Sequence, residues 1–323
     1  MEAITLSQTN DKMPQVGFGT WQIPKEVTKE AVFQAIKMGY RLIDCAPPNA
    51  NEVEVGQGIK EAIDQGIVTR SELFITSKLH STHHHKQHVK LGIEKSLSDL
   101  GLEYLDLYTI HSPIALKYVS IADRYPPSRY YSQIEKNIIF DQVPLHETWA
   151  AMEELVHSGL ARNIGIANIN ASLLMDLLSY AKIKPAVIQK EFHPYHSRKN
   201  LINFAKSKGI AITAFSSLGD TSYQSMGLFD NISGFVPTLE NKVILDIAKN
   251  HSVSAAQVLL RWSVQQGIAV VPKSKNTERM SLNMQVYSFV LSDEEMKSID
   301  DLNKDMRIFD PEFYLEGYPF YAN

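Results

Sequence analysis

Three ionisable residues, Asp44, Lys78 and His111, occupy equivalent places along the chain. Each comes at the trailing end of a short apolar run with β-like character. A single residue of this kind is usually solvated or hydrogen-bonded scaffolding, but three at the ends of neighbouring strands indicate a site. An aspartate and a lysine that converge would form a partly buried ion pair, and the ammonium would lower the pKa of a nearby acid.

The elements that must position these residues alternate between short β-branched runs and longer helical patterns, which predicts βα units around a parallel sheet. The predicted strands are Val16–Thr20, Arg41–Ala46, Leu73–Leu79, Leu105–His111, Arg162–Asn168, Ala186–Phe192, Ala211–Ser217 and Ala269–Lys273. The predicted helices are Lys29–Met38, Glu52–Asp64, Val89–Leu100, Leu145–Val156, Ser172–Ala181, Leu201–Ser207 and Ala255–Gln265. About eight such units predict one α/β domain over residues 1–323, a (β/α)8 TIM barrel.

Two stretches do not fit the repeat. One is the connection from Ser112 to about Val143, and the other is the tail from Asp301 to Asn323, which is rich in Phe, Tyr and Pro. Both are too long for ordinary connections, so we expect functional loops over the barrel mouth. The mouth, at the C-terminal ends of the strands, is also where such barrels carry their reacting groups.

Composition favours a small-molecule ligand. The net charge is −4 with no basic run, which argues against a nucleic-acid or membrane-surface partner. No apolar stretch reaches the roughly 18 residues of a membrane span, and the first residues lack a secretory pattern, so the expected compartment is the cytoplasm. Cys45 is the only cysteine, which excludes an internal disulfide and a multi-cysteine zinc site.

A series of short motifs runs along the chain in order: Gly17-Phe18-Gly19-Thr20-Trp21, Ile43-Asp44-Cys45-Ala46, Asn51-Glu52, Glu54-Val55-Gly56, Ser77-Lys78-Leu79, Leu105-Asp106-Leu107-Tyr108, Ile110-His111-Ser112-Pro113, Gly165-Ile166-Ala167-Asn168, Gln189, Glu191-Phe192-His193-Pro194-Tyr195 and Val271-Pro272-Lys273-Ser274. With these motifs the chain resembles the aldo-keto reductases over almost its whole length. Its long loop and Asp310-Pro311 resemble those of the xylose reductases of fungi. The resemblance implies an NAD(P)H-dependent oxidoreductase that is a monomer or a homodimer.

The resemblance also implies that NADPH or NADH lies extended across the barrel mouth. Asn168 and Gln189 would hold the nicotinamide amide, and Phe215 would stack on its ring. The remaining implied cofactor residues are Gly19, Thr20, Trp21, Asp44, Ser216, Ser217, Leu218, Lys273, Ser274, Asn276, Arg279 and Asn283. The cations at the adenosine end favour NADPH, because they suit a 2′-phosphate. Gly17-Phe18-Gly19 lacks the third glycine of the Gly-rich dinucleotide fingerprint.

The general acid of the resembled family is a tyrosine five residues after the aspartate, and here that position is Asn49. The neighbouring Asn51 and Glu52 stay in register, so the substitution is not an alignment slip. An amide can donate a hydrogen bond but has no proton to give up near neutral pH. General acid catalysis is typically worth about 10²–10⁴-fold, so ordinary carbonyl reduction should be weak unless another group substitutes.

Candidate substitutes for the acid lie nearby. His80 stands where the family usually has a tryptophan, and by strand alternation it points the same way as Lys78. It would either replace the acid or reshape the substrate pocket, and Tyr130 or Tyr131 of the long loop is a further candidate. The run His83-His84-His85 has no partner ligands at metal spacing, so we expect a solvated polar turn and no metal site.

Two hypotheses of different classes follow. The first is an enzyme in which His111 orients the substrate, Asp44 and Lys78 set the local field, and hydride passes to a carbonyl or to an atypical acceptor. Such an acceptor would be an activated ketone, an imine or a conjugated double bond. The alternative is a catalytically impaired protein that binds the cofactor in a sensor or structural role. Retention of Lys78, His111 and the cofactor motifs favours the enzyme.

Overall fold

The computed structural model describes residues 2–219 and 235–309 of the chain. Eight parallel strands form a sheet in sequential order. They are β3 (Gly17–Gly19), β4 (Leu42–Asp44), β5 (Phe74–Leu79), β6 (Leu105–Ile110), β7 (Ala161–Ala167), β8 (Val187–Glu191), β9 (Ala211–Phe215) and β10 (Ala269–Val270). The prediction of eight strands in one parallel sheet is confirmed.

The sheet closes on itself between its first and last strands. Val16 pairs in parallel with Val270, and the amide of Gly19 donates to the carbonyl of Pro272 at 3.1 Å. A Cβ on Gly19 would lie 2.4 Å from the carbonyl oxygen of Val271, so only glycine allows the backbones to approach this closely. The closed sheet is the barrel that the sequence predicts.

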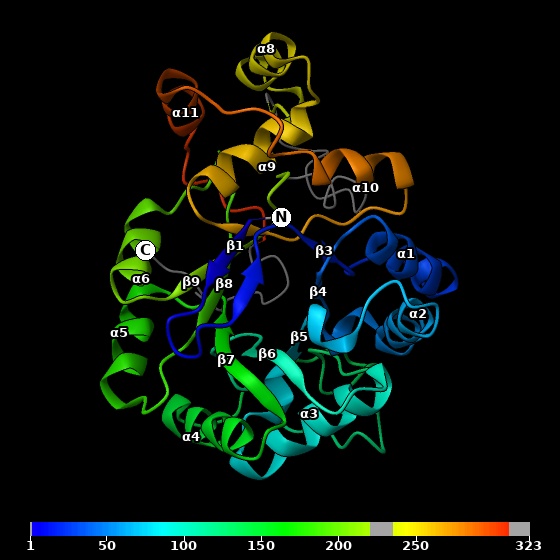
Figure 1. Cartoon of the computed structure of the whole chain (residues 1–323). Helices are drawn as coiled ribbons and strands as arrows, with labels where there is room; N and C mark the ends of the chain where they lie inside the picture. Colours follow the sequence, from blue (N-terminus) through cyan, green and yellow to red (C-terminus); the bar gives the residue numbers. More distant parts are fainter. Residues whose placement is uncertain (1, 220–234, 310–323) are drawn as a thin grey trace.

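Helices surround the barrel, as Figure 1 shows. In chain order they are α1 (Lys25–Lys37), α2 (Glu52–Asp64), α3 (Lys86–Leu100), α4 (Leu145–His157), α5 (Ala171–Tyr180), α6 (Lys199–Ser207), α8 (Lys242–His251), α9 (Ala255–Gln265), α10 (Thr277–Met284) and α11 (Asp293–Asp300). Several start at side-chain caps, for example the capping box of Ser254 and Gln257 before α9. Apolar side chains between strands and helices make the main core, where Phe192 stacks on Trp262.

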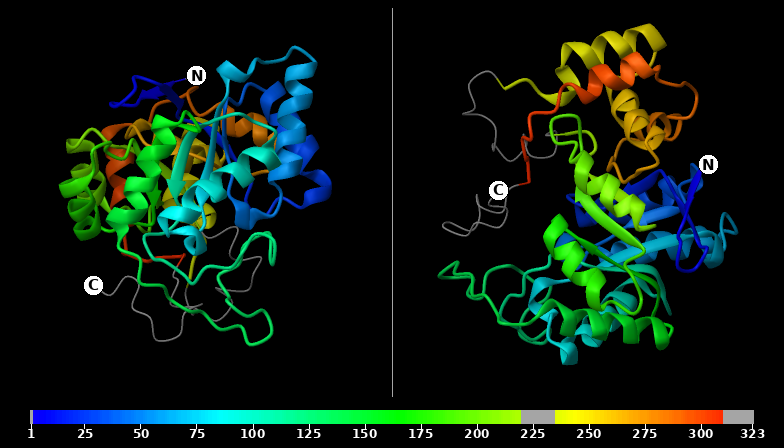
Figure 2. Two further views of the ribbon diagram at one scale, coloured as in Figure 1. Left: turned by 90° about the horizontal axis from the view of Figure 1, so that it is seen from below. Right: turned by 90° about the vertical axis from the view of Figure 1, so that its left-hand side faces the viewer.

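A hairpin that the sequence did not predict seals the N-terminal end of the barrel. It consists of β1 (Ala3–Thr5) and β2 (Lys12–Pro14), which pair antiparallel. Leu6 and Met13 from this segment are fully buried against side chains of the barrel interior. Figure 2 shows the hairpin at the end opposite the long loop.

The long loop after β6 lies at the C-terminal end of the barrel, on the same side as the segment that leads to the C-terminus (Figure 2). The Tyr125 hydroxyl donates to Oε2 of Glu52 on α2 at 3.3 Å, which ties the loop to the barrel wall. Ile308 and Phe309 donate backbone hydrogen bonds to the Glu191 carboxylate at the end of β8. The rest of the predicted tail, from residue 310 onwards, lies outside the described residues.

Several residues that the sequence placed inside strands lie just beyond them, among them His111, Asn168 and Phe192. Strands β6, β7 and β8 end one residue before His111, Asn168 and Phe192 respectively. Asn168 adopts a left-handed backbone with φ of 59°, which turns the chain out of the strand ladder. His111 and Asn168 therefore follow their strands, whereas Asp44 and Lys78 belong to theirs.

Candidate active site

Asp44 and Lys78 form an ion pair at the mouth of the barrel. They lie at the ends of the neighbouring strands β4 and β5, which pair in parallel. The Lys78 Nζ lies 2.9 Å from Oδ1 and 3.0 Å from Oδ2 of Asp44, and it also donates to the carbonyl oxygen of Cys45 at 2.8 Å. The Lys78 side chain is only 5% exposed and the Asp44 side chain 14% exposed. The convergence that the sequence predicts is present, and the three ammonium hydrogens face three acceptor atoms.

The Asp44 carboxylate receives two further hydrogen bonds. Thr76, two residues before Lys78 on β5, donates its hydroxyl to Oδ1 at 2.7 Å. Gln189 on β8 donates its amide to the same oxygen at 2.9 Å. Sequence reasoning missed Thr76, although the alternation of side chains along a strand places it on the same face as Lys78. Three donor side chains from the two strands β5 and β8 therefore fix the carboxylate through four hydrogen bonds.

His111 lies directly after β6 and stays neutral. Burial and the positive charge of Lys78 lower the pKa of the imidazole to about 3, while Asp44 acts in the opposite direction. Its backbone is held on both sides, because its amide donates to Leu79 and its carbonyl accepts the side-chain amide of Asn168 at 2.9 Å. A neutral imidazole at this position can orient a substrate oxygen through a hydrogen bond.

Asn49 ends a short 3-10 helix, Pro47–Asn49, between β4 and α2. Its side-chain amide donates to Oγ1 of Thr20 at 3.1 Å, and the Thr20 hydroxyl donates to the backbone oxygen of Asp44 at 2.9 Å. Thr20 is completely buried, so it supports Asn49 and the strand end. The amide is thus part of the scaffold beneath the ion pair and brings no acidic proton to it.

His80 follows β5 and is almost buried, with 9% of its surface exposed. Its Nδ1 accepts the backbone N–H of Thr82 at 3.3 Å and lies 2.8 Å from the Thr82 hydroxyl. Because a backbone N–H can only donate, Nδ1 carries the lone pair and the neutral ring carries its proton on Nε2. Burial first, then the charges of His111, His83, His84 and Arg124, lower the pKa of His80 well below its ordinary value.

The prediction of a solvated turn at His83-His84-His85 is wrong for its first two residues. His83 is 3% and His84 1% exposed, and burial lowers the pKa of each to about 4. Tyr118 from the long loop packs edge-on against His83, and Thr148 on α4 donates to the carbonyl of His84. Tyr118 and Thr148 therefore cover the turn. Both are distant from it in sequence, so the local sequence pattern does not predict this burial. Among the described residues no group of side chains suits a metal ion.

The two loop tyrosines contact cations of their own loop. The Tyr130 hydroxyl lies 3.2 Å from a guanidinium nitrogen of Arg129, and the Lys117 ammonium sits over the Tyr131 ring. Within the described residues, neither hydroxyl bonds to Asp44, Lys78 or His111. The structure therefore does not bring either tyrosine into the candidate site.

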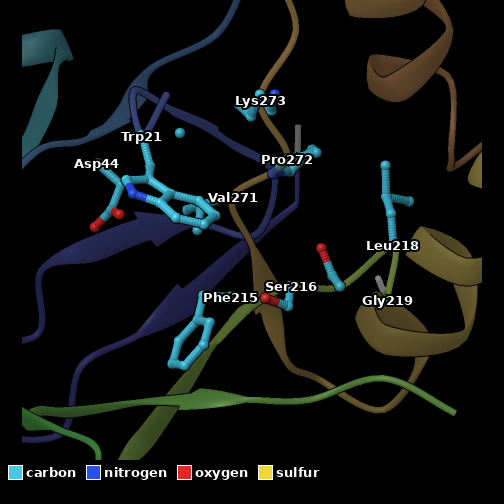
Figure 3. Close-up of a pocket in the computed structure, with 11 residues that line it drawn as sticks. Trp21, Asp44, Phe215, Ser216, Leu218, Gly219, Val271, Pro272 and Lys273 are labelled. Carbon is cyan, nitrogen blue, oxygen red and sulfur yellow. The ribbon is translucent and has the colours of Figure 1, made fainter. Parts of the chain in front are cut away.

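A narrow cavity of about 110 Å³ leads away from Asp44 across the mouth (Figure 3). Asp44 and Trp21 lie at one end of it, and Leu218 and Gly219 at the other. The lining residues are Gly19, Trp21, Asp44, Phe215, Ser216, Ser217, Leu218, Gly219, Val271, Pro272 and Lys273. Most residues expected to contact the middle of an extended cofactor therefore share one cavity.

A second cavity of about 600 Å³ shares Leu218 and Lys273 with the first. Its other lining residues are Gln22, Ile23, Leu239, Ser254, Ala256, Ser274, Lys275, Arg279, Leu282 and Asn283. Burial, and then Lys275 and Arg279, lower the pKa of Lys273. Three cations with no carboxylate among the lining residues fit a polyanionic group, so the donor set suits a dinucleotide with a phosphate at this end.

Four residues expected to contact the cofactor line neither cavity, namely Thr20, Asn168, Gln189 and Asn276. Asn276 does not line the cavity, because its side chain caps α10 by accepting the amide of Arg279 at 2.9 Å. Thr20 lines neither cavity and is buried beneath Asn49. A residue that sequence reasoning missed is Glu191, whose carboxylate holds Ile308 and Phe309 and thereby sets the Phe309 ring edge-on to Phe215 at 5.8 Å.

The fold and the site together define a class of protein, the barrel oxidoreductases. The barrel has eight parallel strands, and the carboxyl ends of these strands carry an Asp–Lys pair, a neutral histidine and an extended cleft. The aldo/keto reductase family model matches residues 15–304, and the chain belongs to this family. A 4-dihydromethyl-trisporate dehydrogenase of Mucor mucedo is 46% identical, with 98% of each chain covered. A probable NAD(P)H-dependent D-xylose reductase of Emericella nidulans is 48% identical over 94% of each chain.

Further relatives agree with these. An NADPH-dependent aldose reductase of Saccharomyces cerevisiae is 44% identical, with 100% of each chain covered. The solved structure of the aldose reductase from Schistosoma japonicum superposes with a TM-score of 0.87 at 33% identity, covering 99% of this chain and 98% of that one. No helix among the described residues is long and apolar enough to cross a membrane.

Proposed function

We propose that the protein is an NADPH-dependent reductase that transfers hydride to a carbonyl or to an acceptor that needs no strong acid. The observation that supports this most is the intact Asp44–Lys78 pair beside neutral His111, at the end of a cleft that runs to a cationic cavity. A protein that only bound a nucleotide would have no use for a buried ion pair whose carboxylate also accepts hydrogen bonds from Thr76 and Gln189.

NADPH would lie with its nicotinamide near Asp44 and its 2′-phosphate near Lys273 and Arg279. The amide nitrogens of Asn168 and Gln189 are already used within the protein. Their oxygens are therefore the atoms that would accept hydrogen bonds from the cofactor carboxamide. Phe215 offers its ring for stacking. When bound, the reduced nicotinamide supplies the hydride.

The proton must come from a group other than the residue at position 49. Lys78 directs its ammonium at Asp44 and Cys45, so it polarises the site rather than supplies a proton. His80 holds a neutral imidazole with its proton on Nε2, on the ring edge opposite Thr82. We assign this N–H to the substrate oxygen or nitrogen, with His111 as the second hydrogen-bond partner that orients it.

This assignment favours acceptors that need a weak acid. A neutral imidazole is a weaker acid than a phenol flanked by an ammonium. A substrate whose reduction generates a strongly basic alkoxide would therefore be reduced slowly. The substrates would be reactive aldehydes, activated ketones, imines or conjugated carbonyls. The names of the relatives point to open-chain aldoses and to a trisporate derivative as first compounds within these classes.

Stopped-flow mixing with NADPH and a panel of aldehydes, ketones, imines and enones tests the proposal. Cofactor binding is read from nicotinamide fluorescence, and turnover from the loss of its absorbance. We expect oxidation with at least one class, and its loss in Lys78→Met with cofactor binding retained. NADPH binding without oxidation by any compound would leave a non-catalytic cofactor binder as the better account.

A further inference from the structure

Behind His80 lies an unbroken chain of proton-carrying groups. Nδ1 of His80 lies 2.8 Å from Oγ1 of Thr82, and that same oxygen lies 3.0 Å from Nδ1 of His83. Thr82 and His83 are 4% and 3% exposed, so bulk water does not compete for these contacts. A hydroxyl between two imidazoles can pass a proton in either direction, because it donates to one ring while it accepts from the other.

The resting direction of the chain follows from the backbone. The Thr82 N–H gives Nδ1 of His80 the role of acceptor, so the Thr82 hydroxyl donates to His80 and accepts from Nδ1–H of His83. The pKa of His83 is lowered to about 4 by burial and by His88, which keeps its ring neutral as such a chain requires. Every hydrogen in the chain is then directed from His83 towards His80.

The far end of the chain approaches the surface. Among the described residues, Nε2 of His83 and Nδ1 of His88 are both buried without a hydrogen-bond partner, and the two ring centroids are 6.4 Å apart. A water molecule between the two rings would satisfy both nitrogens. His88 stacks on Tyr118 and contacts His85, which is 42% exposed and lies 3.1 Å from Asp141.

We propose that His83, Thr82 and His80 form a proton relay that takes the place of the tyrosine acid, with Thr82 as its obligatory middle member. This rests on the proposed reductase function. For each turnover the substrate carbon accepts a hydride and its oxygen takes the proton from Nε2 of His80. Nδ1 of His80 takes the proton of Thr82, Thr82 takes that of Nδ1 of His83, and Nε2 of His83 takes one from solvent.

The relay balances and leaves no charge behind. Each of the three residues gives one proton and receives one, so all end neutral, and one proton is taken up per NADPH oxidised. The simultaneous arrival of a proton at Nδ1 is what allows a neutral imidazole to release its Nε2 proton without becoming an anion. After product release, exchange with solvent at the mouth and at His83 restores the resting direction.

The other groups around the relay support neutral transfer. His111, His84 and Arg124 act on His80, and His88 and Tyr118 face His83. The main causes of the lowered pKa at both rings are burial and neighbouring cations, with no carboxylate among them, so they favour the neutral form. The proton therefore moves through neutral rings rather than on a charged histidine.

The test compares Thr82→Val, which removes the hydroxyl but keeps shape and backbone N–H, with Thr82→Ser, which keeps the hydroxyl. Thr148→Val is the matched control, because it removes another buried hydroxyl, bonded to the carbonyl of His84, outside the relay. Single-turnover rates of NADPH oxidation are measured in H2O and in D2O, together with the NADPH dissociation constant and the substrate KM.

We expect Thr82→Val to lower the single-turnover rate about 10- to 100-fold, which is up to the lower end of the 10²–10⁴-fold range of general acid catalysis, because His80 keeps its Nε2–H. The NADPH dissociation constant and KM should stay unchanged, and the solvent isotope effect should lose its multi-proton dependence on D2O fraction. Thr82→Ser and Thr148→Val should stay near wild type. An unchanged rate in Thr82→Val, or an equal fall in all three variants, would overturn the relay.

These outcomes are separate from those for the proposed function. If wild type oxidises NADPH and Thr82→Val does so equally fast, only the relay is wrong. If wild type oxidises no NADPH with any acceptor, the reductase proposal itself fails. Should Thr82→Val not fold, as judged by circular dichroism, His83→Gln breaks the same chain and carries the same expectation.

Discussion

The side-chain amide of Asn49 donates to the hydroxyl of Thr20 at 3.1 Å, and Thr20 donates to the backbone oxygen of Asp44. Asparagine therefore supports the strand end that carries the ion pair, at the position where the resemblance to the family implies a tyrosine acid. Because an amide brings no acidic proton, we propose that the proton comes from another group.

Restoring the phenol tests whether the rest of the site is ready for it. In Asn49→Tyr the hydroxyl would lie near Lys78, whose ammonium lowers the pKa of an adjacent acid. We expect kcat/KM for simple aldehydes to rise at least about tenfold, and by no more than the 10²–10⁴-fold that general acid catalysis typically contributes. Asn49→Phe is the control, since it adds the ring without the acid. No gain over this control would mean that the pocket has been rebuilt.

The Asp44–Lys78 pair should also contribute to stability. Removing one partner of a buried pair typically costs about 3–5 kcal/mol, because the other charge is left uncompensated. In Lys78→Met we expect a loss near the lower end, about 3 kcal/mol, because Thr76 and Gln189 still donate to the carboxylate. Urea unfolding measures it. A stability equal to that of wild type would show that the pair is not buried in solution.

Arg279 should discriminate between the two nicotinamide cofactors. It lines the cationic cavity with Lys273 and Lys275. A hydrogen bond to a charged group is worth about 1.5–3 kcal/mol, so Arg279→Ala should weaken NADPH binding about 10- to 100-fold. NADH binding should change little, because NADH lacks the 2′-phosphate. Lys297→Ala, which removes an exposed cation of α11, is the control. Equal losses for NADPH and NADH would contradict the assignment of the phosphate to this cavity.

Buried neutral histidines should make the fold sensitive to acid. The pKa values of His83, His84 and His196 are lowered to about 4, and that of His111 to about 3, from the ordinary 6.5, in each case mainly by burial. Between these values the unfolded chain binds protons that the folded chain does not. The contribution of these histidines to the free energy of unfolding is therefore fully present above pH 6.5, their ordinary pKa, and is lost as the pH decreases towards about 4.

Urea unfolding at about pH 7 and about pH 5 measures this effect, with each unmatched proton contributing up to about 1.4 kcal/mol per pH unit. The change in unfolding free energy per pH unit reports the number of protons that the chain takes up when it unfolds. In His84→Gln this number should be smaller than in wild type by close to one. A variant with the wild-type slope would show that His84 is protonated or exposed in the folded protein.

Much of this architecture follows from local sequence pattern. Alternating strand and helix patterns predict the barrel, and the ends of adjacent strands must bring Asp44 and Lys78 together. The hairpin of β1 and β2 was missed because three-residue strands carry too little periodicity. His83 and His84 were misplaced at the surface because Tyr118 and Thr148, distant in sequence, cover them. Such long-range burial also conceals the contact between Thr82 and His80.

We propose that His80 supplies the proton in place of the tyrosine that the resemblance to the family implies. The most direct test is the single-turnover rate of NADPH oxidation at saturating acceptor in wild type and in His80→Phe, which keeps a planar ring without an N–H. The account predicts a fall of about 10²-fold or more with unchanged NADPH binding. A His80→Phe variant that oxidises NADPH as fast as wild type would contradict it.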